Sequence, residues 1–285
     1  MSTDDFAVRA FASGLGILLT FFDDLEQEFR TFRRRAPCIL LPFTLKAAHR
    51  AAAGRIAAAL EHEASTGIEP PYHSRYHVAE SVLAMDLLSR EAIRLGLIDE
   101  YLASLGILAM IGHDLGHDGT LPDTPRLEQY AAAEVAVLTT DLGTVAGDIL
   151  RQVILATAPA QVPQNLALSR APHPTPLDTI SALANEADVL ASLLPELGWD
   201  LSDLLAQEWA EHDPTRAAGA RSFAGRQAFL LLYANPSPAA CSLGLDQVIA
   251  RGLDAFEPDG AAALDLLPRA DAMNRYRARL NAIPA

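Results

Sequence analysis

The chain has 285 residues, half of them apolar, and a formal net charge of −14. This length and apolar content can fill a large core, so we expect one compact unit or a domain with a helical extension. The acidic balance argues against a nucleic-acid polymer as a partner, because binding to DNA or RNA requires a basic surface.

The N-terminal part, residues 1–69, is predicted to be helical and to pack on a core formed by residues 70–285. Its apolar run GLGILLTFF (14–22) is too short to cross a bilayer, so we expect no membrane partner. Its clearest helix is TLKAAHRAAAGRIAAALEHE (44–63), with Thr44 as the N-cap. The acidic start of the chain lacks a secretory-signal pattern, and Cys38 and Cys241 provide no disulfide framework. We therefore expect a cytoplasmic protein.

A first pair of histidines, His73 and His77, directly follows two prolines, Pro70 and Pro71. Proline favours the first turn of a helix, so the sequence predicts a helix that begins here and continues through residues 78–96. Residues four apart share a helix face, and both imidazoles can then reach one cavity.

A second polar group ends the apolar segment EYLASLGILAMIG (100–112), which is typical of a buried helix. His113 and His117 again stand four residues apart, and Asp114 projects in another direction from the same turn. Gly116 and Gly119 indicate where this helix passes into a loop.

The remaining segments also favour helices, because long stretches carry helical periodicity and alternating strand-like runs are scarce. The predicted fold class is therefore all-α, a multi-helix bundle. The stretch 158–179 is rich in proline and polar residues, which predicts a loop that could border a functional site. A turn is predicted at 257–260, followed by a short helical tail.

Imidazole and carboxylate groups are the ligands that hold divalent cations able to activate water. Each residue alone has an ordinary structural explanation, and a lone histidine on a helix is more often a core or surface residue. Two histidine pairs, an His-Asp doublet and the later Asp188 form a less common combination. Together they predict a site for metal-assisted hydrolysis.

These motifs resemble the HD-domain metallophosphohydrolases, and most closely the class I cyclic-nucleotide phosphodiesterases. That family carries YHNxxHA, then HDxxHPG, then a downstream aspartate. YHSRYHVA (72–79) resembles the first motif with Ser74 in place of Asn, and HDLGHDG (113–119) resembles the second with Asp118 in place of Pro. RLEQ (126–129), VILATAPAQ (153–161) and residues 182–209 resemble later family segments, so the likeness covers roughly residues 70–240.

The resemblance implies an HD-domain, phosphodiesterase-like helical bundle and a role for each matched residue. His77, His113, Asp114 and Asp188 would bind a first metal ion, Zn or Fe/Mn. Asp114 would bridge to a second, more hydrated ion, Mg or Mn, with His117 and Glu128 holding the waters around it. His73 would be the general acid that protonates the leaving oxygen.

The family also holds a purine ring with a Gln-x-x-Phe element, and this chain departs from it. Phe229 matches the aromatic residue, but Arg226 stands at the position of the glutamine, with Gln227 beside it. An amide offers both a donor and an acceptor, whereas a guanidinium offers donors only. Either Gln227 replaces the glutamine, or the substrate carries an anionic or carbonyl-rich group, or Arg226 simply lies on a solvated helix face.

The expected function is hydrolysis of a phosphodiester by a bimetal-activated hydroxide, with cyclic AMP or cyclic GMP as the leading substrate. The expected partner is thus a small-molecule phosphoester, and a homo-oligomer is possible. One alternative is an HD-domain hydrolase of another phosphoester, either a nucleotide monophosphate or a non-nucleotide diester. A second alternative is a non-catalytic module that senses a nucleotide, which predicts tight binding without product.

Overall fold

The computed structural model describes residues 46–67, 69–122, 124–195 and 197–254, and every regular element in these ranges is a helix. The all-α prediction is therefore confirmed for the described chain. The elements, in chain order, are η2 (Ala47–His49), α3 (Arg50–Thr66), α4 (Arg75–Arg94), α5 (Glu100–Gly112), α6 (Arg126–Leu138), η3 (Thr140–Leu142), α7 (Thr144–Ala156), η4 (Pro159–Gln161), α8 (Val162–Ser169), α9 (Pro176–Leu193), α10 (Gly198–Trp209), α11 (Pro214–Ala220), α12 (Phe223–Leu232), α13 (Pro238–Ser242) and α14 (Leu245–Asp254).

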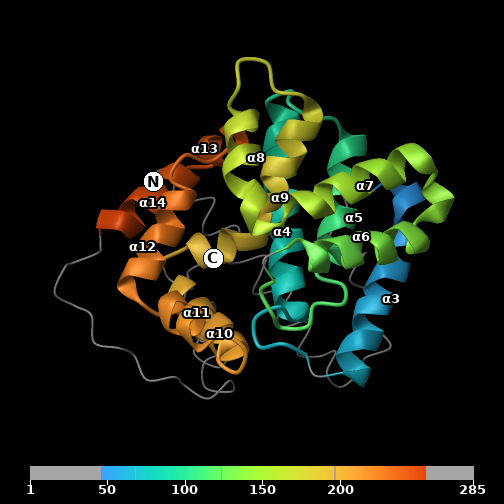
Figure 1. The fold of residues 1–285 in the computed structure, drawn as a ribbon. Helices are drawn as coiled ribbons and strands as arrows, with labels where there is room; N and C mark the ends of the chain where they lie inside the picture. The colour runs from blue at the N-terminus through green and yellow to red at the C-terminus, as the bar shows by residue number, and fades with distance from the viewer. Residues whose placement is uncertain (1–45, 68, 123, 196, 255–285) are drawn as a thin grey trace, which may run out of the picture.

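Helices α4, α5 and α9 form the centre of the fold. Helix α4 packs along both α5 and α9, and α5 also contacts α7 and α3. In α5, every residue from Leu102 to Gly112 is buried, as its uniformly apolar sequence predicts. Figure 1 shows α3, α6 and α7 on one side of this centre and α10, α11, α12 and α14 on the other. The first turn of α4, the end of α5 and the second half of α9 carry His77, His113 and Asp188 in this centre.

Helix α4 begins later than the sequence predicted. Its first residue is Arg75, and Ser74 occupies the N-cap position. The backbone N–H groups of Tyr72 and His73 donate to the carboxylate of Glu208 at 2.9 and 3.0 Å instead of joining the helix. The prediction that His73 and His77 share a helix face is therefore wrong, since His73 lies in the preceding turn and His77 in the first turn of α4.

Helix α5 ends at Gly112, so His113 is its C-cap and His117 lies beyond it. Gly116 has a φ of 78° and turns the chain away from the helix axis. Its N–H donates to Glu63 at 2.8 Å, which ties this turn to α3. The prediction that Gly116 and Gly119 indicate the passage from helix to loop is confirmed, although the regular helix already ends at Gly112.

The stretch 158–179 is not one loop, because it contains η4 and α8. The buried Asn165 of α8 donates to the Ala156 carbonyl at 3.1 Å and to Asn185 of α9 at 2.8 Å, and these bonds fix the helix between its neighbours. Helix α9 then begins in a capping box, in which the Thr175 side chain and the Asp178 backbone N–H are paired.

In the N-terminal part, the predicted helix appears as η2 followed by α3. Its expected N-cap, Thr44, lies outside the described residues, as do the turn at 257–260 and the tail. The division at residue 69 stays a prediction. Among the helices that the structure describes, none combines the length and apolar character needed to span a bilayer.

Candidate metal centre

Four side chains from three helices converge at the centre of the fold. His77 comes from the first turn of α4, His113 and Asp114 from the end of α5, and Asp188 from α9. Nε2 of His77 lies 2.9 Å from Oδ1 of Asp188 and 3.3 Å from Oδ2 of Asp114. Nε2 of His113 lies 3.3 and 3.2 Å from the same two oxygens. Two nitrogens and two oxygens therefore face one point.

A backbone hydrogen bond fixes the orientation of the His113 ring. Its Nδ1 lies 2.9 Å from the carbonyl oxygen of Met110. A carbonyl only accepts, so this nitrogen carries the proton, and the neutral ring presents the Nε2 lone pair to the aspartates. Such a hydrogen bond behind the ring is typical of metal-binding histidines. Nδ1 of His77 faces a carboxylate oxygen of Glu80 at 3.9 Å, and it has no hydrogen-bond partner among the described residues.

The spacing of the four atoms fits a small divalent cation. Ligands about 2.0–2.1 Å from a tetrahedral zinc ion lie about 3.3 Å apart, close to the four nitrogen–oxygen distances, which run from 2.9 to 3.3 Å. Oδ2 of Asp114 is buried and makes no hydrogen bond within the described part of the chain. A cation would satisfy this oxygen, so the residues present fit a metal ion.

The charges of this cluster are strongly coupled. Burial alone would lower the pKa of His77, but hydrogen bonding to Asp188 and the nearby carboxylates raise it to about 10. The pKa of His113 is likewise raised against the effect of burial, by Asp114 and Asp188. The pKa of Asp188 is lowered, again against burial, by hydrogen bonds from both histidines. Without a cation, protons on the histidines balance the aspartates, and a bound metal would displace them.

A second group of possible ligands shares Asp114 with the first. Ligand atoms of His73, Asp114 and His117 lie within 4.8 Å of one another, and the same holds for His77, His113 and Asp114. The rings of His73 and His117 stack with centroids 3.7 Å apart. The N–H of Gly119 donates to Nδ1 of His117 at 3.1 Å. Burial and the charge of His73 lower the pKa of His117 to about 4, so His117 is neutral near pH 7.

Glu208 of α10 is part of the site and was missed by sequence reasoning. Its Oε1 lies 2.5 Å from Nδ1 of His73, and its Oε2 accepts the two N–H groups that precede α4. Burial would lower the pKa of His73, but the charge and hydrogen bond of Glu208, together with the charge of Asp114, raise it above its ordinary value. No local motif marks Glu208, because the pairing spans 135 residues of sequence.

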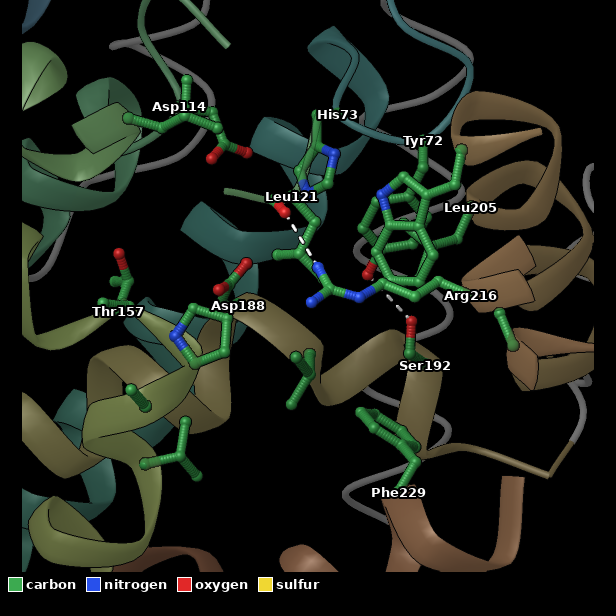
Figure 2. A pocket seen from close by; sticks show the side chains of 18 of the residues that line it. Tyr72, His73, Asp114, Leu121, Thr157, Asp188, Ser192, Leu205, Arg216 and Phe229 are labelled. Carbon is green, nitrogen blue, oxygen red and sulfur yellow. Dashed lines mark hydrogen bonds between the residues drawn. The ribbon is translucent and has the colours of Figure 1, made fainter. Parts of the chain in front are cut away.

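The clustered side chains open into a cavity of about 590 Å³. Its wall includes His73, Asp114 and Asp188 (Figure 2), and also His117 and Glu128. The segment 157–162 and parts of α10–α12 complete it. Glu128, in the first turn of α6, has a pKa raised by burial and by the nearby aspartates. The volume suits a small molecule of nucleotide size.

The three residues expected to contact substrate are separated by the structure. Arg226 and Phe229 line the cavity, whereas Gln227 lies on the exposed face of α12 and is absent from the cavity wall. The Arg226 side chain is buried, donates to the carbonyl oxygen of Ser192, and lies 5.4 Å from the centre of the Phe229 ring. The solvated-face interpretation therefore does not apply to Arg226.

No model of a protein family matches the sequence, and no curated protein matches it. Among solved structures, the chain is similar to LmjPDEB1, a Leishmania phosphodiesterase, in complex with IBMX. That likeness has 14% sequence identity and a TM-score of 0.45, and covers 82% of this chain and 87% of that chain. At this level of similarity the comparison assigns neither a function nor a site residue to this chain.

Proposed function

We propose that the chain is a metal-dependent phosphodiesterase, with a cyclic nucleotide as its leading substrate. The observation that carries the proposal is the place of Asp114 in the cavity wall, with its carboxylate close to His77 and His113 on one side and to His73 and His117 on the other. A carboxylate in this position can bridge two cations. The motif resemblance of residues 72–79 and 113–119 supports the same assignment.

His77, His113, Asp114 and Asp188 would hold the first ion, and Asp114 would also contact the second. A pair of divalent ions here would neutralise the phosphodiester charge and lower the pKa of water towards neutrality. His117 is neutral near pH 7 and Glu128 lines the same cavity, so both can orient water by hydrogen bonds. Their place beside Asp114 suits the outer shell of the second ion.

His73 is the proposed general acid. Glu208 accepts a hydrogen bond from Nδ1–H and favours the imidazolium form, whose Nε2–H can then donate to a leaving oxygen in the cavity. The same glutamate also fixes the backbone of residues 72 and 73, so it orients the ring as well as its charge. We therefore assign Glu208 as a positioning residue for His73.

The test is product formation from cyclic AMP and cyclic GMP with added Mn²⁺, with His113→Ala as the control. Formation of the nucleoside monophosphate by wild type, and its loss in His113→Ala, would support the diesterase. Tight nucleotide binding without any product would instead favour the sensor alternative. Turnover of a phosphomonoester but of neither cyclic nucleotide would favour the other hydrolase class.

A further inference from the structure

Arg226 is a buried cation that lacks a carboxylate partner within the part of the chain that the structure describes. Its side chain is 4% exposed, and its contacts are the carbonyl of Ser192 and the face of Phe229. A guanidinium has five N–H donors, so a single hydrogen bond leaves most of them available. Burial lowers the pKa of Arg226 to about 10, which still leaves it charged at neutral pH.

A buried charge is costly unless it is paired, and a carbonyl with an aromatic ring compensates it only in part. The chain nevertheless makes room for this group. A Cβ added to Gly198, the first residue of α10, would lie 2.0 Å from a terminal nitrogen of Arg226. Because Arg226 lines the cavity, a ligand there can supply the missing partner.

The position of Arg226 relative to the metal centre follows from α9. Ser192, which accepts its hydrogen bond, stands four residues after Asp188 on that helix. One helical turn separates them, a rise of about 6 Å. Figure 2 shows Asp188 and Ser192 on this helix, with Phe229 beyond Ser192 on the side away from Asp114. If the phosphate of a small substrate is held at the metal centre, the rest of that substrate can therefore extend along α9 to Arg226.

The neighbouring polar groups of the cavity wall are also donors. Nε1 of Trp209 is buried and has no hydrogen-bond partner among the described residues. Arg216 extends its guanidinium to the carbonyl of Leu121 at 2.8 Å across the cavity (Figure 2). The hydroxyl of Ser192 is already bonded to Tyr72 at 3.0 Å. Of these groups, Trp209 therefore offers an N–H donor that has no partner within the described part of the chain.

We propose that Arg226 forms a subsite for the part of the substrate that is remote from the scissile phosphate. This subsite selects groups that present only hydrogen-bond acceptors. Two sources share this chemistry: the O6/N7 edge of a guanine-type base, and a carboxylate. Adenine is disfavoured, because its N6 amino group would set a donor against the guanidinium. The inference rests on the proposed function, because that function places the phosphate at the metal centre.

The test is calorimetric binding to the full-length, Mn²⁺-loaded protein, which needs no turnover. One ligand set compares 5′-GMP and 5′-IMP with 5′-AMP, and IMP excludes a contribution of the guanine amino group. The other compares 3-phosphoglycerate with glycerol 3-phosphate, which differ at the carboxylate. Arg226→Met removes the donors at similar length, Arg226→Gln supplies an amide, and Arg251→Met, an exposed arginine of α14, is the matched control.

In one of the two ligand sets, we expect wild type and Arg251→Met to bind the ligand that presents only acceptors about tenfold more tightly than its counterpart. Arg226→Met should abolish the preference, and Arg226→Gln should reduce it because an amide can also accept from adenine. A preference for GMP and IMP over AMP would identify a guanine-type base as the group that Arg226 binds. A preference for 3-phosphoglycerate over glycerol 3-phosphate would identify a carboxylate. Because Met removes a buried charge, the variant is expected to fold, which its helical circular dichroism checks.

Equal affinities of wild type and Arg226→Met for every ligand would overturn the subsite, as would the absence of binding by wild type. The proposed function fails separately. Binding with an Arg226-dependent preference but no hydrolysis of cyclic nucleotides would remove the diesterase and keep the subsite. Hydrolysis without any preference that depends on Arg226 would keep the diesterase and remove the subsite.

Discussion

Nδ1 of His73 lies 2.5 Å from Oε1 of Glu208, and both carboxylate oxygens of Glu208 contact the segment that carries this histidine. The pair joins the turn before α4 to the last turns of α10. It raises the pKa of His73 against the effect of burial and lowers that of Glu208, also against burial. The pair therefore favours the protonated form of His73, as the proposed general acid requires.

Glu208→Gln should shift the pH dependence of kcat. A general acid must be protonated, so activity falls as the pH rises through its pKa. Removing the carboxylate lowers the pKa of His73, so this basic limb should move to lower pH. Above neutrality the loss in kcat should be about tenfold to hundredfold, within the usual contribution of proton transfer.

The pH–rate profile of Glu208→Gln should be compared with that of Glu211→Gln, which changes an exposed carboxylate three residues along the chain. The control should retain the wild-type profile. An unshifted basic limb in Glu208→Gln would contradict the role assigned to this residue. A fall in kcat with the limb unmoved would indicate a structural effect alone.

Asp188→Ala should lose bound metal and remain folded. Its carboxylate contacts the Nε2 atoms of both His77 and His113, so its removal takes away a ligand that both rings face. Elemental analysis after dialysis should show less metal per chain than in wild type, with the helical circular dichroism retained. Asp148→Ala, an exposed aspartate of α7, is the control. Full metal content in Asp188→Ala would refute the assignment.

Gly198→Ala should displace the Arg226 side chain. The added Cβ would lie 2.0 Å from the guanidinium and 2.5 Å from the Ser192 carbonyl oxygen, so backbone as well as side chain must move. We expect a loss of about 1–3 kcal/mol in the free energy of unfolding, as for overpacked cores. The preference among ligands that depends on Arg226 should weaken too.

Thermal unfolding and ligand binding measure these two effects. Gly147→Ala in α7 is the matched control, because a Cβ there meets no atom within 4 Å. Alanine favours helix over glycine by about 1 kcal/mol, so this control should be stabilised slightly. If Gly198→Ala is as stable as Gly147→Ala and keeps the wild-type ligand preference, Gly198 is not needed to accommodate Arg226.

Asn185→Leu should destabilise the wall formed by α7, α8 and α9. Asn185 donates to the Ala156 carbonyl at 2.6 Å and accepts from Asn165 at 2.8 Å, all at buried positions. Leucine would leave Asn165 with an unsatisfied donor, at an expected cost of about 1–3 kcal/mol in the free energy of unfolding. Chemical denaturation measures this, with the exposed Gln164→Leu as control. Equal stability of the two variants would contradict the account.

The sequence predicts well those features that depend on the residues of a single helix. The apolar composition of residues 100–112 predicts the buried α5, and helical periodicity predicts the all-α fold. The spacing of the histidines was less reliable. His73 and His117 lie outside the helices because contacts with Glu208 and the turn at Gly116 end the regular backbone. The contacts with Glu208 are tertiary and leave no periodic signal, whereas Gly116 does indicate the end of its helix in the sequence.

Long-range partners account for the rest of what was missed. Glu208 meets His73 across 135 residues, and a glutamate in LLAQEWAEH has no local feature that separates it from a surface residue. The prolines around α8 predict a loop, but Pro163 lies in the first turn of that helix, where proline is tolerated. The burial of Arg226 depends on Gly198 and Ser192, which come from other helices.

The central claim is that Asp114 joins two metal sites, and anomalous X-ray scattering from crystals grown with Mn²⁺ tests it most directly. The account predicts two anomalous peaks that flank Asp114, one among His77, His113 and Asp188 and the other on the side of His73 and His117. A single peak would reduce the site to one ion and remove the bridging role. The absence of a peak near Asp114, in crystals that hold Mn²⁺ elsewhere, would contradict the metal centre itself.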